Sequence, residues 1–488
     1  MKYPAADVAR MLVETGARNG PLHSQLSHGL RELIDLGELP PDAILPSERS
    51  LADALTVSRT TVVSAYAALQ AEGRLERRQG SGTRVCAPTA ATRETVSAGI
   101  LAGDHVSAQY LNGPLATIDF STAALPMAAC VADVATQITR DTYLALGEHH
   151  HGYHPRGLIE LRQRIADYYT AAGLPTSAEQ ILITSGAQQA LELVAHGCLE
   201  RGDAVITEEP TYRGALDAFA RAGARMHAVP CDEHSTDVTA LERLTTAHVP
   251  RLIYVQSTVH NPTGAVLPAS RRGTLVHIAE QHRSILVDDT SLAETAFSKK
   301  RPLPLAAHTR SDRIITIGSL SKLFWGGLRI GWIRGARKVV ARLAQMKGLS
   351  DLGTSLVSQQ IGLGLFDLIE ATARTRRSEL TAGLATLTEL LEQALPSWSW
   401  QEPQGGASLW VRLPSGDATG LAQVALRYGV AILPGAVFSA TGTTDDHLRL
   451  PYSLRRSVLT AGVSRLAQAW EAYTQHGVRA VPTESVRT

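Results

Sequence analysis

The chain has 488 residues, of which 44% are hydrophobic and 19% charged, and its formal net charge at pH 7 is +1. This composition excludes disordered and fibrous proteins and indicates two or three domains around a large core. The small net charge excludes a general polyanion binder, so any contact with nucleic acid must come from a local patch.

No apolar run approaches the ~18 residues of a membrane span, and the segment Met1-Lys-Tyr-Pro lacks the apolar core of a signal peptide. We therefore expect a cytoplasmic protein. The four cysteines have neither CxxC nor metal-ligand spacing, so we expect reduced, packed thiols and no metal site. They are Cys86, Cys130, Cys198 and Cys231.

Helical patterns come first along the chain. The apolar spacing over residues 22–33 predicts a first helix. A short second helix follows Ser47, and a third over residues 59–72 follows Ser58; either serine can cap its helix by accepting a hydrogen bond from a free amide. Because only the short Thr56-Val57 connection separates the second helix from the third, the pattern predicts a helix-turn-helix.

Two short strands over residues 75–85, around a Gln-Gly-Ser-Gly turn, predict a hairpin that would form a wing. In such a unit the N-terminal residues of the last helix enter the DNA major groove, while other basic residues meet the backbone. A small helical dimerisation domain with a hairpin is the alternative. The residues expected at DNA are Arg49, Ser58, Arg59, Thr60, Thr61, Arg77, Arg78, Gly82 and Arg84.

Together these motifs resemble the winged helix of GntR-type bacterial repressors. The matching segments are Leu45-Pro-Ser-Glu-Arg-Ser-Leu-Ala52, Ser58-Arg-Thr-Thr-Val-Val63 and Gly80-Ser-Gly-Thr83. The resemblance covers about residues 20–86, and it implies operator DNA as a partner. We place this DNA-binding domain at residues 1–86.

Residues 87–115 are rich in Ala, Thr, Ser and Gly, which predicts an interdomain linker. From there to residue 477, short β-branched runs alternate with helical segments. This alternation predicts an α/β domain over residues 116–477 with a mostly parallel, buried sheet. The polar segment 478–488 is predicted to be a disordered tail.

A lysine at the end of a buried strand is the main candidate for chemistry in this second domain. Lys322 follows the apolar run Ile314–Ile317, and Schiff-base formation with an aldehyde is a common reason to place a lysine there. Ser319, Ser321 and Arg329 supply two hydroxyls and a cation that would hold the phosphate of pyridoxal phosphate. A surface loop with a solvated lysine is the alternative.

Four residues at a strand-to-helix turn predict an anion site, because backbone amides point outward at a helix N-terminus. They are Ser185, Gly186, Ala187 and Gln188. An ordinary turn is the alternative reading. Tyr212 is placed to stack on a pyridine ring or to fill the core, and Asn261 to bond a ring hydroxyl or to shape a turn.

Two acidic residues end the strand that begins at Ile285. A buried carboxylate is costly without a partner, and a protonated pyridine nitrogen would be such a partner. We choose Asp288 over Asp289 for this role, with an exposed acidic strand end as the alternative. Arg449, between apolar residues, suits bidentate binding of a substrate carboxylate or a structural ion pair.

In order and spacing these pieces resemble fold type I pyridoxal phosphate aminotransferases, over about residues 118–475. The resemblance implies a smaller C-terminal subdomain and a homodimer in which Tyr153 reaches the cofactor phosphate of the partner subunit. At the two places where the family has a tyrosine that bonds the ring oxygen, this chain has Thr290 and Ser291. We expect the Thr290 hydroxyl to replace part of that contact with the cofactor but not the acidity or reach of a phenol, which predicts poor transamination.

The fusion of both domains looks like the MocR group of bacterial transcriptional regulators. It implies a regulator that binds pyridoxal phosphate and changes its DNA complex when the cofactor, or an amino compound captured by it, binds. The alternatives are an active aminotransferase that carries a DNA-binding domain, or an inert fold used only for dimerisation.

Overall fold

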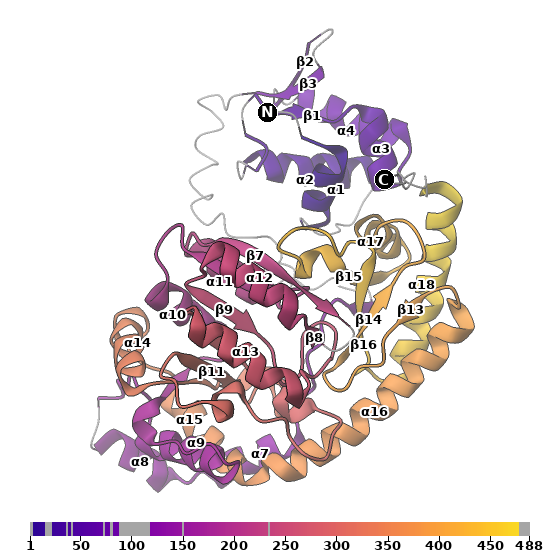
Figure 1. The fold of residues 1–488 in the computed structure, drawn as a ribbon. Helices are drawn as coiled ribbons and strands as arrows, with labels where there is room; N and C mark the ends of the chain where they lie inside the picture. The colour runs from indigo at the N-terminus through magenta and orange to yellow at the C-terminus, as the bar shows by residue number, and fades with distance from the viewer. Residues whose placement is uncertain are drawn as a thin grey trace.

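The structure is a computed structural model that describes residues 3–14, 22–35, 38–40, 42–71, 74–78, 82–86, 118–148, 151–232 and 235–477. The predicted linker at 87–115 and tail at 478–488 lie outside these residues. No helix in the described ranges is long and apolar enough to cross a membrane. The chain forms an N-terminal helical unit above a larger body that contains two sheets (Figure 1).

The N-terminal unit is a winged helix. Its sheet has the strand order β1-β3-β2, and its helices enclose a core of their own. Its elements are α1 (Ala5–Glu14), α2 (Leu22–Asp35), β1 (Ile44–Leu45), α3 (Glu48–Leu55), α4 (Arg59–Ala71), β2 (Leu75–Arg78) and β3 (Gly82–Val85).

The predicted helix-turn-helix and wing are confirmed in this unit, including both helix caps. The Ser50 amide donates to Ser47 Oγ, and the Thr61 amide donates to Ser58 Oγ, each at 3.1 Å. The prediction that the helix at 22 is the first one is wrong, because α1 precedes it. Val8 and Leu12 of α1 are buried, but two apolar turns are too short a pattern to stand out in the sequence.

The larger body is built on an eight-stranded sheet in the order β5-β12-β11-β10-β9-β6-β7-β8. The strands β11, β10, β9, β6 and β7 run parallel, whereas β12 is antiparallel to both of its neighbours and β8 to β7. The strands are β5 (Ile181–Thr184), β6 (Ala204–Glu209), β7 (Arg225–Asp232), β8 (Ser235–Thr236), β9 (Leu252–Val255), β10 (Ile285–Asp289), β11 (Ile314–Ser319) and β12 (Gly331–Arg334). The predicted mostly parallel sheet is thus confirmed.

Helices cover both faces of this sheet (Figure 1). One core cluster joins it to α10 (Ala187–Cys198), α11 (Arg213–Arg221) and α14 (Arg337–Ser350). A second cluster, on the opposite face, includes α7 (Ala129–Gln137), α9 (Ile159–Ala171), α12 (Val238–His248), α13 (Ala269–Gln281) and α15 (Leu356–Leu365), with α8 (Arg140–Glu148) at its periphery. Because strands are buried on both sides, their sequences are nearly continuous apolar runs.

A smaller subdomain holds the five-stranded sheet β13-β14-β16-β15-β4. The long helix α16 (Ile369–Ala394) leads into it from the large sheet, and α17 (Ala418–Arg427) and α18 (Arg456–Gly477) cover it. Its strands are β4 (Ile118–Phe120), β13 (Ser399–Trp400), β14 (Ser408–Arg412), β15 (Val430–Pro434) and β16 (His447–Pro451). Here β4, the first strand of the second domain, pairs in parallel with β15 near its end.

The winged helix contacts this smaller subdomain. Helix α1 lies against α17. Arg427 Nη2 donates to the backbone oxygen and to Oγ1 of Thr56, both at 3.2 Å, and Thr56 is in the turn between α3 and α4. The helix-turn-helix is therefore in direct contact with the domain that carries the candidate cofactor site.

Candidate cofactor site and nucleic-acid interface

Lys322 lies just beyond the end of β11, where the strand turns back toward β12. Its environment lowers the pKa of the amine to about 8, first because burial disfavours the charged form and then because Arg449 is near; the negative charge of Asp289 opposes this shift. A small cavity is lined by Lys322, Asn261 and Arg449, among other residues. The structure thus brings together three side chains that the sequence analysis selected.

The two carboxylates at the end of β10 point to opposite faces of the sheet, as neighbouring strand residues must. Asp289 faces Lys322: Tyr254 Oη donates to its Oδ2 at 3.0 Å, and burial raises its pKa while Lys322 opposes the rise. Asp288 faces the other side, where Ser257 Oγ and the Leu305 amide donate to it at 2.8 and 2.7 Å.

These contacts favour Asp289 for the partner of a pyridine nitrogen, whereas the sequence analysis chose Asp288. Burial raises the pKa of Asp288 to about 6, and hydrogen bonds from Leu305 and Ser257 limit the rise. The sequence alone does not give the strand register, which separates the two aspartates. Tyr254 pairs with Val287, and Asp289 lies two residues after Val287, so its side chain is on the same face as that of Tyr254. Asp288 as the nitrogen partner remains a prediction.

The predicted anion site, a cradle of backbone amides, lies where α10 begins. Gly186 is the N-cap and has a φ of +91°, no side chain caps the helix, and the backbone of Gly331 approaches so closely that a Cβ there would lie 2.6 Å from the Gly186 carbonyl carbon. Arg329 reaches the same place, and its Nη2 donates to the Ser185 oxygen at 2.5 Å. Ser321 Oγ is buried and has no hydrogen-bond partner among the described residues.

The remaining residues predicted to hold phosphate have local partners. Ser185 Oγ is 3.3 Å from Thr354 Oγ1, and Ser319 Oγ donates to the Ile330 oxygen at 3.3 Å. Gln188 Nε2 donates to the Gly214 oxygen at 3.0 Å. The side chains of Ser185, Gln188 and Ser319 are thus engaged locally, whereas Arg329 reaches the start of α10 and the Ser321 hydroxyl has no partner among the described residues.

Tyr212 and Asn261 are held in place by neighbouring side chains. Tyr212 Oη donates to Gln188 Oε1 at 3.1 Å, which ties the ring to the start of α10. The backbone amide of Asn261 donates to Gln256 Oε1 at 3.1 Å, and the side-chain Oδ1 of Asn261 accepts from Arg449 Nη1 at 3.5 Å. Both positions stay predictions as cofactor contacts.

Arg449 is 5% exposed on β16 and has a guanidinium that is only partly used. Its Nη2 donates to the Ser121 oxygen at 2.5 Å and its Cζ lies 4.8 Å from the centre of the Phe438 ring. Its Nε is buried without a hydrogen-bond partner among the described residues. A buried cation with an unused donor suits an incoming carboxylate.

The position of the family tyrosine has no phenol. Thr290 Oγ1 donates to the Ile317 oxygen at 2.7 Å, so its proton is already used, and Ser291 Oγ is buried without a partner among the described residues. Tyr153, predicted to reach a partner subunit, is 67% exposed in this chain. Its role stays a prediction.

The sequence analysis missed a polar chain that supports the cradle. Gln189 Oε1 accepts from the Ser185 amide at 2.8 Å, and Gln189 Nε2 donates to Asp351 Oδ2 at 2.7 Å. Asp351 in turn accepts from Lys347 Nζ at 2.7 Å on α14. Lys347 is fully buried, and a charged residue in an otherwise apolar helix face was the available signal.

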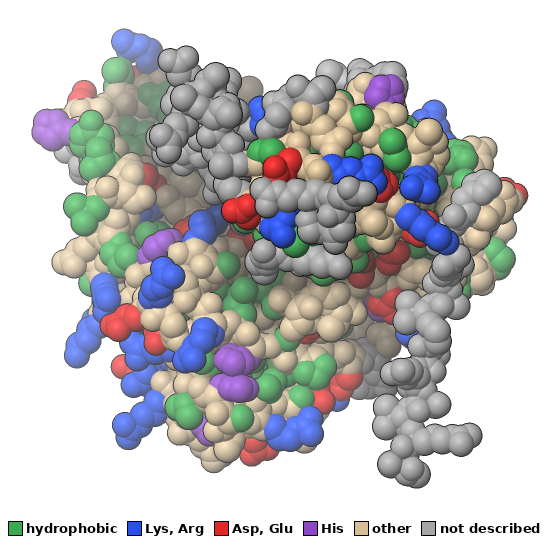
Figure 2. Space-filling view, turned by 90° about the horizontal axis from the view of Figure 1, so that it is seen from above, with side chains coloured by type: hydrophobic (Ala, Val, Ile, Leu, Met, Phe, Trp, Pro, Cys, Tyr) green, Lys and Arg blue, Asp and Glu red, His purple; other side chains and the backbone are tan. Residues whose placement is uncertain are grey.

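The predicted DNA-binding side chains lie on α3, α4 and the wing. Arg49, Arg59 and Thr60 are exposed, while Arg77 also pairs with Glu48 at 3.4 Å. Ser58 Oγ caps α4 and contacts Thr61 Oγ1 at 2.8 Å, so it is used locally. Arg84 and Gly82 lie on β3, and the side chain of Arg78 is outside the described residues. Basic side chains stand among acidic ones in the view from above (Figure 2).

Comparison with known proteins agrees with this two-part architecture. Residues 118–466 match the family of aminotransferases class I and II, and residues 22–85 match the gntR family of bacterial regulatory proteins. The chain is similar to the uncharacterized HTH-type transcriptional regulator YisV of Bacillus subtilis, with 29% identity over 89% of this chain and 92% of the relative.

Two further matches extend the comparison. The probable rhizopine catabolism regulatory protein MocR of Rhizobium meliloti is 32% identical over 66% of this chain and 67% of its own. The crystal structure of LysN, the alpha-aminoadipate aminotransferase of Thermus thermophilus, complexed with N-(5'-phosphopyridoxyl)-L-leucine, superposes with a TM-score of 0.69 at 29% identity, covering 74% of this chain and 93% of LysN.

Proposed function

The chain belongs to the aminotransferase class I and II family and joins that domain to a gntR-family winged helix, as MocR-type regulators do, and from this premise we propose how it senses a ligand. It is a DNA-binding transcriptional regulator, and its aminotransferase-like domain binds pyridoxal phosphate. The sensing step is the capture of an amino compound at Lys322, which changes the affinity of the winged helix for operator DNA.

One observation carries this proposal: Lys322 and Arg449 line one cavity, and Asp289 is near enough to Lys322 to affect its pKa, in a chain whose winged helix contacts the same body. When bound, the cofactor supplies an aldehyde that links to an amine and a ring that withdraws electrons. The lowered pKa of Lys322 leaves about half of its amine neutral near pH 8, and the neutral amine is the form that attacks an aldehyde.

Each neighbouring group has a proposed task. The amides of Gly186 and Ala187, with Arg329 and the unpartnered hydroxyl of Ser321, hold the phosphate dianion. The carboxylate of Asp289 accepts a hydrogen bond from the protonated ring nitrogen. Arg449 binds the carboxylate of the amino compound, so we propose an α-amino acid or a similar amino carboxylate as the effector.

A homodimer completes the proposal. Tyr153 is largely exposed, as is Arg329, both of which suit a site that a second subunit covers. Two winged helices in a dimer would contact two half-sites of one operator.

An active aminotransferase is the second candidate, and the intact pair of Lys322 and Arg449 favours it. Against it, Thr290 and Ser291 supply no phenol to bond the ring oxygen, and the Thr290 hydroxyl already donates to a backbone oxygen. Proton transfer tuned by such a group is typically worth ~10² to 10⁴ in rate. We therefore expect capture of an amine without efficient turnover.

The proposal is tested by trapping the cofactor on its lysine. Purified protein with pyridoxal phosphate should absorb in the ~400 nm region, and borohydride should remove the band and leave a label on the peptide that contains Lys322. Lys322→Ala should abolish the label and retain some phosphate-anchored cofactor. Lys338→Ala, which removes an exposed lysine of α14, is the control and should behave as wild type. Undiminished labelling of Lys322→Ala would overturn the assignment.

A further inference from the structure

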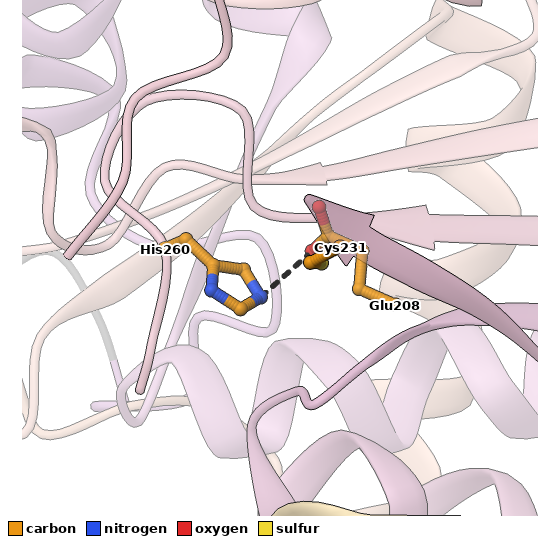
Figure 3. Close-up of side chains that lie close together, drawn as sticks. All are labelled: Glu208, Cys231 and His260. Carbon is orange, nitrogen blue, oxygen red and sulfur yellow. Dashed lines mark ion pairs between the residues drawn. The ribbon is translucent and has the colours of Figure 1, made fainter. Parts of the chain in front are cut away.

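Three side chains of the types that bind metals meet beside the parallel sheet, and one of their residues, His260, also lines the cofactor cavity. Glu208 comes from β6, Cys231 from β7 and His260 from the loop after β9. One ligand atom of each lies within 4.8 Å of the other two, and Figure 3 shows the three side chains turned toward one another. Because each comes from a separate segment, no sequence spacing marks them as a set.

The imidazole of His260 is oriented as a ligand would be. Its Nδ1 is 2.7 Å from Thr263 Oγ1, and its Nε2 faces Glu208 Oε2 at 3.5 Å. The residue is 1% exposed, and Nε2 has no hydrogen-bond partner among the described residues. A hydrogen bond on one ring nitrogen that leaves the other free is the usual arrangement around a metal-binding histidine.

The carboxylate of Glu208 is likewise oriented by hydrogen bonds from neighbouring residues. Thr236 Oγ1 donates to its Oε1 at 2.5 Å, and the Gln256 amide donates to its Oε2 at 2.8 Å. Of the described basic side chains, His260 is the one that lies within ion-pair distance of the Glu208 carboxylate.

We propose that Glu208, Cys231 and His260 form a binding site for Zn²⁺. Thiolate, imidazole and carboxylate are the ligands zinc takes in proteins, at about 2.0 to 2.3 Å, so that ligand atoms lie roughly 3.3 to 3.7 Å apart. The 3.5 Å between His260 Nε2 and Glu208 Oε2 already meets this spacing. The Cys231 thiol loses its proton to solvent when zinc binds, and water fills the fourth position.

The site would act on the neighbouring cofactor loop. His260 directly precedes Asn261, and the Gly264 amide donates to the His260 oxygen at 2.7 Å. Zinc would therefore tie this loop to β6 and β7 and fix the position of Asn261. Cys231 is partly exposed as a residue, whereas Glu208 and His260 are buried.

The test measures zinc in the full-length protein with its cofactor. After chelation and dialysis against buffered zinc at micromolar concentration, mass spectrometry of the metal should find one zinc ion per chain. Cys231→Ser and His260→Gln should each weaken zinc binding by at least about tenfold. Cys198→Ser is the matched control, because Cys198 ends α10 away from the cluster, and it should bind zinc as wild type does.

A second readout needs no variant: cobalt substituted into the wild-type protein should give a sulfur-to-cobalt charge-transfer band. Less than one zinc ion per chain in the wild type, a cobalt spectrum without the thiolate band, or undiminished zinc affinity in a folded Cys231→Ser would each overturn the proposal.

Discussion

At the scale of single residues, burial decides what Lys322 can do. A solvated lysine is almost fully protonated at pH 8, whereas this amine has a pKa of about 8 because burial disfavours its charge and Arg449 adds repulsion, so about half of it is then neutral. The sequence could predict the lysine and its motif, since an apolar run followed by Ser-Leu-Ser-Lys is a local pattern. It could not predict the pKa, because Arg449 and Asp289 approach from distant segments.

The pH dependence of cofactor attachment follows from this pKa. The neutral amine attacks the aldehyde, so the rate of attachment of pyridoxal phosphate to the cofactor-free protein should rise with pH, pass half of its maximum near pH 8 and then level off. Stopped-flow absorbance across a pH series measures it. A rate that still rises through pH 10, as for a solvated lysine, would mean that Lys322 is not buried as described.

The choice between the two aspartates is testable by a matched pair of variants. Asp289→Asn should weaken retention of pyridoxal phosphate by about tenfold or more, because a charge-assisted bond to the ring nitrogen is lost. Asp288→Asn should leave cofactor affinity nearly unchanged and lower the thermal midpoint, because the Ser257 and Leu305 donors lose a carboxylate. Cofactor titration followed by a thermal melt separates them; the reverse pattern would restore Asp288 to the role.

At the scale of elements, local signals predicted most of what was found. Ser47 and Ser58 cap the helices that they precede, and the apolar runs form the strands of the large sheet. The sequence could not predict long-range strand pairing, such as that of β4 with β15 across most of the second domain. It also could not predict β1, because that strand has only two residues. Strand partners far apart in the chain leave no local pattern.

Helix α4 carries the prediction that belongs to this scale. Arg59→Ala should weaken binding to specific operator DNA by about 1 to 3 kcal/mol at fixed salt, because an exposed arginine in the first turn of the recognition helix loses a base or phosphate contact. Arg243→Ala removes the same charge from the exposed side of α12 and serves as the control. Fluorescence anisotropy measures both; equal affinity of Arg59→Ala and wild type would refute the role of α4.

At the scale of the whole molecule, the aminotransferase-like domain and the winged helix belong to one chain and are in contact. The contact of Arg427 with Thr56 joins α17 of the smaller subdomain to the turn of the helix-turn-helix. Arg449 belongs to β16 of that same subdomain. A ligand that moves Arg449 therefore acts on the element that holds the winged helix, and its effect on DNA affinity equals its difference in affinity for the two states.

The account is tested most directly by the affinity of the full-length protein for its operator, measured by anisotropy without cofactor, with pyridoxal phosphate, and with pyridoxal phosphate plus an amino acid. A coupling of about 1 to 3 kcal/mol predicts that the dissociation constant changes by roughly 5- to 150-fold between these states. The same dissociation constant in all three, together with keto-acid release near the ~10 s⁻¹ of a median enzyme, would contradict the sensor and favour an aminotransferase.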